Sequence, residues 1–207
     1  MPPKAKITKE MIIDAAFEIT RESGIERVNA RTVSEKLGCS TQPVMYYFKK
    51  IEDIKSAVWK KTDDFHTEYI MNIQSNEPMM DIGMNFIRFA ATEKNLFRLL
   101  FQSDGLVEKE VTDMVWTGSA SPMLEVLMKT DNVDLDGARS IFSTIGFYVH
   151  GFASLLANNS MEYNEESARV MLKRVGIGAR YAAKHSELVN QETNFSEDSF
   201  RKKDELL

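Results

Sequence analysis

Residues 29–54, NARTVSEKLGCSTQPVMYYFKKIEDI, combine side chains that can bind nucleic acid. Arg and Gln side chains can form paired hydrogen bonds with guanine and adenine, whereas Lys and Tyr side chains can contact phosphates. Contacts to base edges or the nearby backbone are expected from Arg31, Thr41, Gln42 and Tyr46. Phosphate contacts are expected from Tyr47, Lys49 and Lys50, and Met45 completes the candidate nucleic-acid-binding set.

The element that carries Arg31 is expected to be a short helix with clear signals at both ends. Asn29 can cap its first turn, and Val33 and Leu37 recur at helical spacing. Gly38 stands where the chain needs a left-handed exit. The sequence therefore predicts a tight turn immediately after this helix.

A second helix is expected to carry most of the other candidate side chains. Ser40 offers a hydroxyl to the free amides of its first turn, and Pro43 lies where a missing amide hydrogen costs nothing. Val44 and Phe48 are four residues apart and can face the core, which leaves the polar and aromatic neighbours outside. Two helices joined by about three residues have the spacing of a DNA-binding helix-turn-helix.

These residues resemble the TetR family of bacterial transcription regulators, whose N-terminal three-helix domain has the pattern T-x-R-x-I-A-x-x-x-G-V-S-x-x-x-L-Y-x-H-F-x-x-K-x-x-L. The matching residues are Arg31, Val33, Gly38, Ser40, Val44, Phe48 and Ile54, with Asn29, Ser34, Cys39 and Tyr47 as plausible replacements. Met45 stands where the family has a phosphate-binding tyrosine, and Ile51 stands where it has a lysine. Tyr46, Tyr47, Lys49 and Lys50 are expected to take over those phosphate contacts.

Charge is distributed unevenly along the chain. Residues 1–61 hold 12 Lys and Arg against 8 Asp and Glu, a net charge of +4, and the remainder holds 14 against 23, a net charge of −9. A basic head can attract a phosphate backbone while an acidic body stays away from it. Charge alone is more typical of an ordinary solvated surface.

The composition is that of a soluble chain, with 43% hydrophobic and 28% charged residues among 207. No apolar run approaches the roughly 20 residues that span a bilayer, and the first residues lack the apolar core of a signal peptide. The single cysteine, Cys39, allows no intramolecular disulfide and is expected to be buried packing rather than a redox switch. We therefore expect a cytoplasmic protein without membrane contact.

Helical periodicity without strand alternation predicts an all-α fold. The first helix is expected to begin after Thr8 and end at Gly24, and a longer helix should run over residues 51–75. Further helices are expected over residues 79–92, 94–102, 106–129, 134–158 and 164–187. The resemblance implies a helix-turn-helix DNA-binding domain over 1–54 and a larger helical effector-binding and dimerisation domain over 55–188. The tail over 189–207 has too few apolar groups to pack and is expected to be disordered.

Bulky apolar side chains in the body either form its core or line a ligand cavity. The resemblance implies an apolar pocket for a small-molecule effector. The candidate ligand-binding residues are Phe86, Phe89, Phe97, Phe101, Trp116, Phe147 and His150. Residues 146–158 also resemble the W-x-x-x-H-G stretch of one C-terminal subgroup, where His150 and Gly151 match, and His150 could bind an effector or a neighbouring helix.

The last two long helices carry small residues at steps of three and four. On the final helix these are Ala168, Leu172, Val175, Gly176, Ala179 and Ala183. The resemblance implies that this helix pair forms the interface of a homodimer, and an ordinary helix pair within one chain is the alternative. Two heads must lie about one DNA turn, roughly 34 Å, or a multiple of it apart to read a palindrome.

Catalytic patterns are not found in the sequence. His66, His150 and His185 are isolated from one another along the chain, and H-E-x-x-H, G-x-S-x-G and G-x-x-x-x-G-K motifs do not occur. We expect no enzyme activity, no cofactor and no metal. The hypothesis is a homodimeric repressor that binds a palindromic operator on double-stranded DNA and is released by a largely apolar effector, which tilts the 51–75 helix. The departures at Met45 and Ile51 motivate the alternative, a helical interaction protein that lost operator binding.

Overall fold

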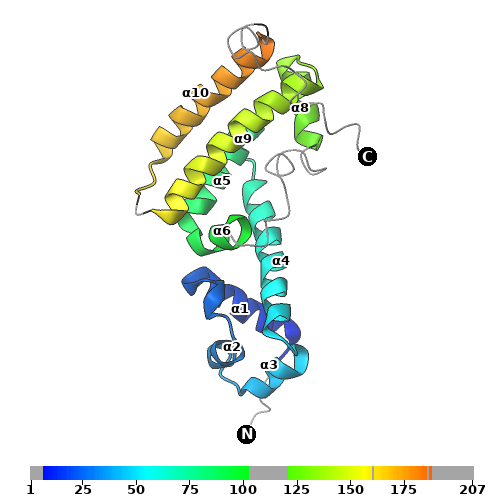
Figure 1. The fold of residues 1–207 in the computed structure, drawn as a ribbon, viewed down its shortest axis with the longest axis vertical. Helices are drawn as coiled ribbons and strands as arrows, with labels where there is room; N and C mark the ends of the chain where they lie inside the picture. Colours follow the sequence, from blue (N-terminus) through cyan, green and yellow to red (C-terminus); the bar gives the residue numbers. More distant parts are fainter. Residues whose placement is uncertain (1–6, 103–120, 160, 186, 188–207) are drawn as a thin grey trace. The chain divides into compact units, whose positions relative to one another are not determined.

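The computed structural model describes residues 7–102, 121–159, 161–185 and residue 187. Every regular element in this part of the chain is a helix, which confirms the predicted all-α fold (Figure 1). The chain divides into two compact units, Met1–Lys109 with Val149–Arg169, and Glu110–Tyr148 with Val170–Leu207. The predicted tail over residues 189–207 lies outside the described residues, and the predicted domain boundary at residue 54 stays a prediction.

The head is built from α1 (Lys9–Ser23), a short 3-10 turn (Ile25–Arg27), α2 (Ala30–Lys36) and α3 (Thr41–Tyr47). Thr8 caps α1 by accepting a hydrogen bond from the Met11 amide at 3.2 Å, and Gly24 ends it with φ at 88°. Both predicted signals are confirmed. Side-chain capping and a left-handed glycine therefore define the ends of α1 locally.

The corner between α2 and α3 follows the predicted pattern with one exception. Asn29 accepts hydrogen bonds from the amides of Arg31 and Thr32, each at 3.0 Å, and Gly38 has φ at 63°. Ser40 occupies the N-cap of α3 but forms no side-chain cap bond, so the predicted capping hydroxyl is wrong. The backbone at Ser40 is extended, as an N-cap requires, and α3 starts without that bond.

One hydrophobic core holds the head together. Ile12 of α1, Val33 of α2 and Val44 of α3 are fully buried, and Phe48 is 4% exposed. Ile54 and Val58 of α4 (Ile51–Ile70) close this core from the next helix. The orientation of α3 is therefore determined by packing against α1, α2 and the first half of α4.

Helix α4 ends at Ile70, five residues before the predicted end at 75. The cause lies on α5 (Pro78–Thr92), because the Asp81 carboxylate accepts hydrogen bonds from the amides of Gln74 at 2.9 Å and Ser75 at 2.6 Å. Asn85 donates to the carbonyls of Ile70 and Asn72. These side chains satisfy the backbone groups that a longer helix would have used, so the chain turns into α5.

The remaining described helices are α6 (Lys94–Phe101), α8 (Ser121–Asp131), α9 (Leu135–Asn158) and α10 (Glu165–Lys184). Their bounds agree with the predictions to within two residues for α6 and α9 and three for α10, whereas the predicted 106–129 helix is described only from Ser121. Within the second unit, Arg180 of α10 pairs with Asp131 of α8 at 2.9 Å.

Helix α9 is the one described helix long and apolar enough to cross a membrane by length and composition. A third of the relevant window is buried inside the protein, and core helices of soluble proteins pass the same test. The sequence analysis expected no apolar run of that length, and α9 is an exception to this expectation.

Candidate DNA interface and effector site

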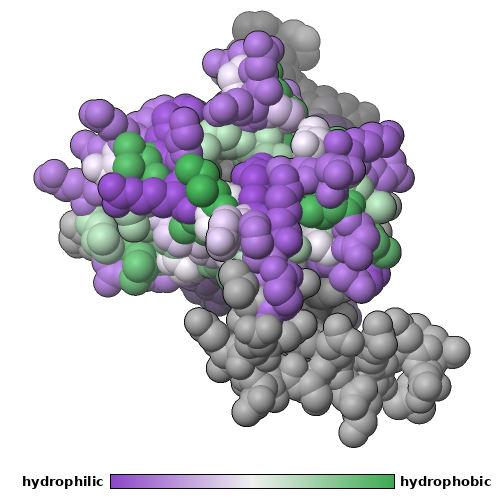
Figure 2. All heavy atoms as spheres, turned by 90° about the horizontal axis from the view of Figure 1, so that it is seen from above, coloured by the Kyte–Doolittle hydropathy of each residue, from purple (hydrophilic) through white to green (hydrophobic). Residues whose placement is uncertain are grey.

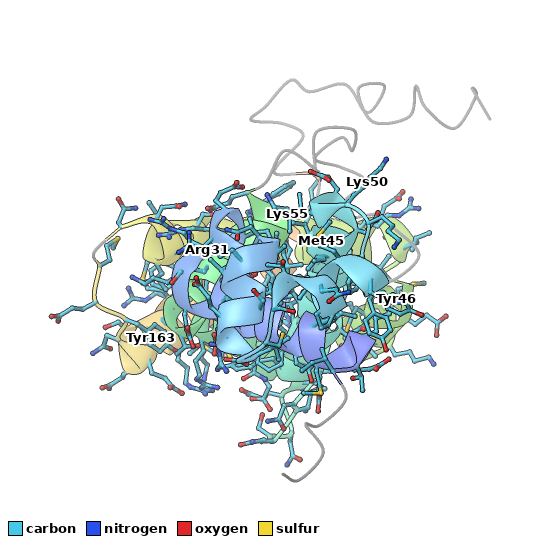
Figure 3. The ribbon with its side chains drawn as sticks, turned by 90° about the horizontal axis from the view of Figure 1, so that it is seen from below. Arg31, Met45, Tyr46, Lys50, Lys55 and Tyr163 are labelled. Atoms are coloured by element: carbon cyan, nitrogen blue, oxygen red, sulfur yellow. The ribbon has the colours of Figure 1, made fainter. Side chains whose placement is uncertain are left out.

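The helix-turn-helix presents the predicted side chains on one exposed surface. Thr41 and Gln42 are exposed at the start of α3, and Met45 and Tyr46 are 45% and 72% exposed in its second half. Figure 3 shows Arg31, Met45, Tyr46 and Lys50 spread over the side of the head that faces the viewer. Because Val44 and Phe48 are buried in the core, the exposed side chains of α3 form an outer surface that we call the reading face, which consists of Thr41, Gln42, Met45 and Tyr46.

Tyr47 is placed differently from its neighbours, because it packs partly buried against the head core. Its ring meets the Tyr46 ring edge to face, with the centroids 5.2 Å apart. The Lys49 ammonium lies 5.8 Å from the centroid of the Tyr46 ring. The exposed Tyr46 ring is therefore held between a partly buried aromatic and a cation.

Lys49 and Lys50 provide cations beside the reading face. Both side chains are exposed, and within residues 7–61 neither has a carboxylate at ion-pair distance, in contrast to Lys55, which lies 3.5 Å from Glu26. Ile51, where the TetR pattern has lysine, packs partly buried against the head core. Position 51 is thus a packing position here, and the nearest exposed cation is Lys50 at the N-cap of α4.

Arg31 lies on α2 and is already paired within the head. Its Nε donates to Glu35 Oε1 at 2.8 Å, and the two side chains are 84% and 60% exposed. This hydrogen bond is the first cause that raises the pKa of Arg31 above its usual value. A phosphate or base that bound the Arg31 guanidinium would therefore compete with Glu35 for it.

The predicted ligand-binding residues are brought together around two histidines. Phe86 of α5 and Phe101 of α6 have centroids 5.3 Å apart, and His150 of α9 lies 6.0 Å from Phe86 and 5.7 Å from Phe101. Phe97 lies 6.0 Å from His150. We call Phe86, Phe89, Phe97, Phe101, His66 and His150 the aromatic cluster.

His66 is a member of this cluster that the sequence reasoning missed, because it treated the histidines as isolated. Its ring lies 4.9 Å from Phe89, 5.1 Å from Phe101 and 5.4 Å from Phe86, so His66 and His150 share two phenylalanine neighbours. The spacing along α4 could have indicated that His66 is buried. Ile54, Val58, Thr62 and His66 follow one another at steps of four, and all four are buried.

Burial disfavours the charged form of both histidines. Burial lowers the pKa of His66 to about 4, and burial also lowers the pKa of His150. His66 is 7% exposed, and its buried Nε2 has no hydrogen-bond partner within the described part of the protein. A buried imidazole nitrogen without a partner can accept or donate one hydrogen bond to a small molecule.

Phe147 and Trp116 are the two remaining predicted ligand-binding residues. Phe147 is 50% exposed on α9, and its role in ligand binding stays a prediction. Its place on the outward side of the helix follows from its spacing of four and eight residues from Gly151 and Leu155, which are also exposed. Trp116 lies outside the described residues.

The head and the aromatic cluster are connected through α6. Glu93, 8% exposed, accepts hydrogen bonds from Arg21 of α1 at 2.7 and 2.5 Å. Leu99 of α6 packs into the head core, while Phe97 and Phe101 of the same helix belong to the aromatic cluster. A displacement of α6 by a ligand would therefore act directly on α1.

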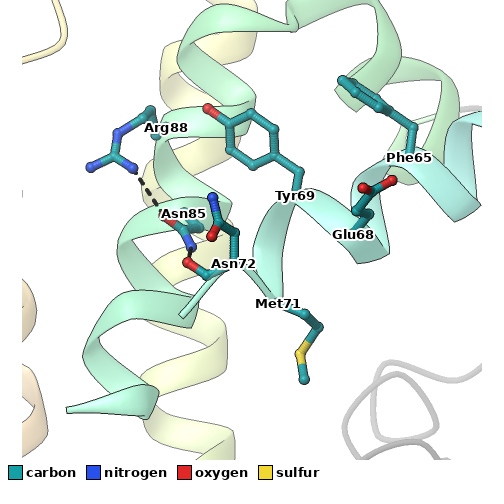
Figure 4. A pocket seen from close by; sticks show the side chains of 7 residues that line it. All are labelled: Phe65, Glu68, Tyr69, Met71, Asn72, Asn85 and Arg88. Atoms are coloured by element: carbon teal, nitrogen blue, oxygen red, sulfur yellow. Dashed lines mark hydrogen bonds between the residues drawn. The ribbon is translucent and has the colours of Figure 1, made fainter. Parts of the chain in front are cut away.

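A separate open pocket of about 760 Å³ lies beside the C-terminal end of α4. Phe65, Glu68, Tyr69, Met71, Asn72, Asn85 and Arg88 line it (Figure 4). Arg88 donates to Asn85 Oδ1 at 2.9 Å and to Glu165 at 2.7 Å, so its charge is already compensated. None of the predicted ligand-binding residues lines this pocket.

Helices α9 and α10 each leave a regular exposed stripe. On α9 it consists of Thr144, Phe147, Gly151 and Leu155, and on α10 it consists of Val170, Arg174, Ile177 and Tyr181. Ile177 and Tyr181 are 61% and 58% exposed. Figure 2 shows apolar residues exposed among hydrophilic ones on one side of the molecule.

The small residues predicted for the interface on α10 lie mainly on the other side of that helix. Ala168, Leu172, Gly176 and Ala179 are buried within the single chain. These four residues therefore pack inside one chain, as expected for an ordinary helix pair within one chain. Their small side chains allow close helix approach. The surface that α10 leaves for a partner is the exposed stripe.

The chain has distant similarity to known proteins. No protein-family model matches the chain. The chain is 21% identical over 172 residues to "Uncharacterized HTH-type transcriptional regulator YobS" of Bacillus subtilis, covering 80% of this chain and 87% of the relative. A solved structure of a TetR transcriptional regulator from Nitrosomonas europaea matches 83% of this chain and 97% of its own, with 15% identity and a TM-score of 0.46.

Proposed function

We propose that this chain, a TetR-like transcriptional regulator, is a homodimeric repressor that binds a palindromic operator and releases it when a small, largely apolar effector binds. The observation that carries the proposal is the helix-turn-helix with its uncharged, exposed reading face and two adjacent lysines without ion-pair partners in the described head. Base contacts come from the reading face, and phosphate contacts come from Lys49 and Lys50. Arg31 joins them after leaving Glu35.

Operator binding is tested by mobility shift with genomic promoter fragments and random duplex at physiological salt. A regulator retains particular fragments well above random DNA. Equal, weak binding of all fragments would contradict the proposal and favour the helical interaction protein that the departures at Met45 and Ile51 motivate.

The two kinds of DNA contact are separated by two substitutions. Lys50→Ala should weaken binding to all sequences and reduce the salt slope by about one for each lysine lost. Gln42→Ala should mainly blur the preference at one or two base positions, by about 1–3 kcal/mol. Lys173→Ala on α10 removes the same charge from an exposed position of the second unit and should leave both properties unchanged.

The exposed stripes on α9 and α10 support a homodimer. Phe147 and Leu155 on α9 and Ile177 and Tyr181 on α10 expose large apolar surface that a second copy of the chain would cover. Gly151 and Gly178 face open space, which permits close approach of a partner helix. Sedimentation equilibrium of the full chain tests the dimer, and a monomer at micromolar concentration would contradict it.

The effector is proposed to bind at the aromatic cluster. Phe86, Phe101 and His150 are only partly buried there, and the buried Nε2 of His66 offers one hydrogen bond to a polar group of an otherwise apolar molecule. Trp116 and the W-x-x-x-H-G subgroup remain predictions. Binding would shift α4, as predicted from the sequence, and α6, which carries Leu99 into the head core.

An effector screen tests this site directly. Compounds are added to the protein–operator complex, and those that release DNA are titrated against the wild type and Phe86→Ala. The variant should lose the response while it keeps operator affinity. A compound that releases both proteins from DNA at the same concentration would contradict the proposed position of the site.

A further inference from the structure

We propose that α3 reads A·T base pairs, with Met45 packing against the 5-methyl group of a thymine and Gln42 pairing with an adenine. The inference rests on the proposed function, because it assumes that the reading face enters the major groove. It concerns the composition of the operator, which the helix-turn-helix by itself leaves open.

The chemical composition of α3 supports this assignment. Its seven residues, Thr41–Tyr47, contain no Arg, Lys, Asp or Glu. Direct reading of guanine relies on Arg or Lys, and reading of cytosine on a carboxylate acceptor. Glutamine forms a bidentate contact with adenine, and apolar atoms contact the thymine methyl. The exposed groups of α3 therefore match the two bases of an A·T pair and lack the usual partners of a G·C pair.

The exposure of Met45 leaves its side chain available to an apolar partner. Its side chain is 45% exposed in the middle of α3, although the neighbouring Val44 is fully buried. Thr41 and Gln42, one turn earlier, are exposed on the same short helix, so the three side chains can contact neighbouring base pairs. Covering the thioether with a thymine methyl removes apolar surface of both groups from water.

Cations of the head lie beside the reading face, which leaves the side chains of the reading face available for contacts with bases. Lys49 and Lys50 follow α3 directly, and Arg31 on α2 is bound to Glu35. The cations that can reach phosphates therefore flank α3 and do not interrupt it. Affinity for the backbone and discrimination between bases come from different residues, so each can be altered separately.

The test starts from an operator selected out of a random duplex library with the full chain. The selected half-site should contain A·T pairs at the positions protected by the head. Each thymine is then replaced by deoxyuridine, which removes only the methyl group. Loss of one buried methyl should weaken binding about fourfold for one half-site and about fifteenfold for both.

Met45→Ala provides the matched comparison, because an exposed side chain can be shortened without opening the head core. The variant should bind thymine and deoxyuridine operators with equal affinity. Met71→Ala, with a methionine 47% exposed at the end of α4, should keep the wild-type dependence on the methyl group. A thermal melt equal to the wild type shows that both variants are folded.

The outcomes separate this inference from the proposed function. Selection of a half-site read through G·C pairs, or an equal response of the wild type and Met45→Ala to deoxyuridine, would overturn the A·T assignment while operator binding stands. A library from which no sequence is enriched would overturn operator binding and this inference together. Where C·G replaces the contacted T·A pair, 5-methylcytosine in place of cytosine should recover part of the lost affinity, because it restores only the methyl group. Equal binding of the cytosine and 5-methylcytosine operators would overturn the role of Met45.

Discussion

His66→Phe should change how the stability of the protein depends on pH. Burial lowers the pKa of His66 from 6.5 to about 4, with no charged group among the causes. The unfolded chain therefore binds a proton at higher pH than the folded chain does. The stability contributed by neutral His66 is complete above the unfolded pKa and is lost as pH falls from about 6.5 toward about 4.

The size of the effect follows from the two pKa values. A shift from 6.5 to about 4 is worth about 3 kcal/mol when it is fully expressed. About 2 kcal/mol of this should be lost between about pH 7.5 and about pH 5. Because His66 is only 7% exposed, solvent screening does not reduce this value strongly. Phenylalanine keeps an aromatic ring among Phe86, Phe89 and Phe101 but cannot take up the proton.

Urea unfolding of the full chain, followed by circular dichroism at a series of pH values, measures the effect. The difference in unfolding free energy between the wild type and His66→Phe cancels the titration of the carboxylates. That difference should move by about 2 kcal/mol in favour of the variant as pH falls to about 5. His150→Phe should move it in the same direction, because burial also lowers the pKa of His150. Parallel stability curves for the wild type and His66→Phe would refute the argument, since they would place the His66 ring in water.

Four further substitutions test three other contacts. In urea unfolding, Arg21→Met should destabilise the protein by about 1–3 kcal/mol more than Glu93→Gln does. Arg21→Met leaves the Glu93 carboxylate, which is 9% exposed, without its partner. In Glu93→Gln the Arg21 side chain, which is 41% exposed, can be hydrated instead. Equal costs would contradict this asymmetry. Glu35→Gln should raise operator affinity severalfold in a mobility shift, because Arg31 loses a competing carboxylate, and unchanged affinity would exclude Arg31 from the interface. Ile177→Glu should shift sedimentation toward monomer without lowering helicity, and an unaltered dimer would place the interface elsewhere.

The head was predictable because its signals are local. Asn29 and Thr8 cap helices within three residues of their own position, and Gly24 and Gly38 adopt the positive φ that their places require. Such interactions depend on neighbours in sequence, so a pattern of residues indicates them. One local prediction was wrong, the capping hydrogen bond to the Ser40 hydroxyl. Ser40 occupies the N-cap of α3 without forming that bond.

The length of α4 was not predictable in the same way. Its end depends on Asp81 and Asn85, which bind backbone groups of residues 70–75 from the next helix. The helical periodicity of α4 does not indicate these partners, because they lie on α5. An end determined by another element becomes visible only when both elements are in place.

By itself the sequence determined the class of fold, the helix-turn-helix and the polar and aromatic residues that its second helix exposes, because helix periodicity, capping and burial of Val44 and Phe48 follow from neighbours along the chain. Only the tertiary structure decided that His66 and His150 meet around Phe86 and Phe101, and that Phe147 faces outward. The tertiary structure also decided that Glu93 accepts hydrogen bonds from Arg21 of α1. These contacts join residues up to 72 positions apart, and the packing of separate helices brings them together.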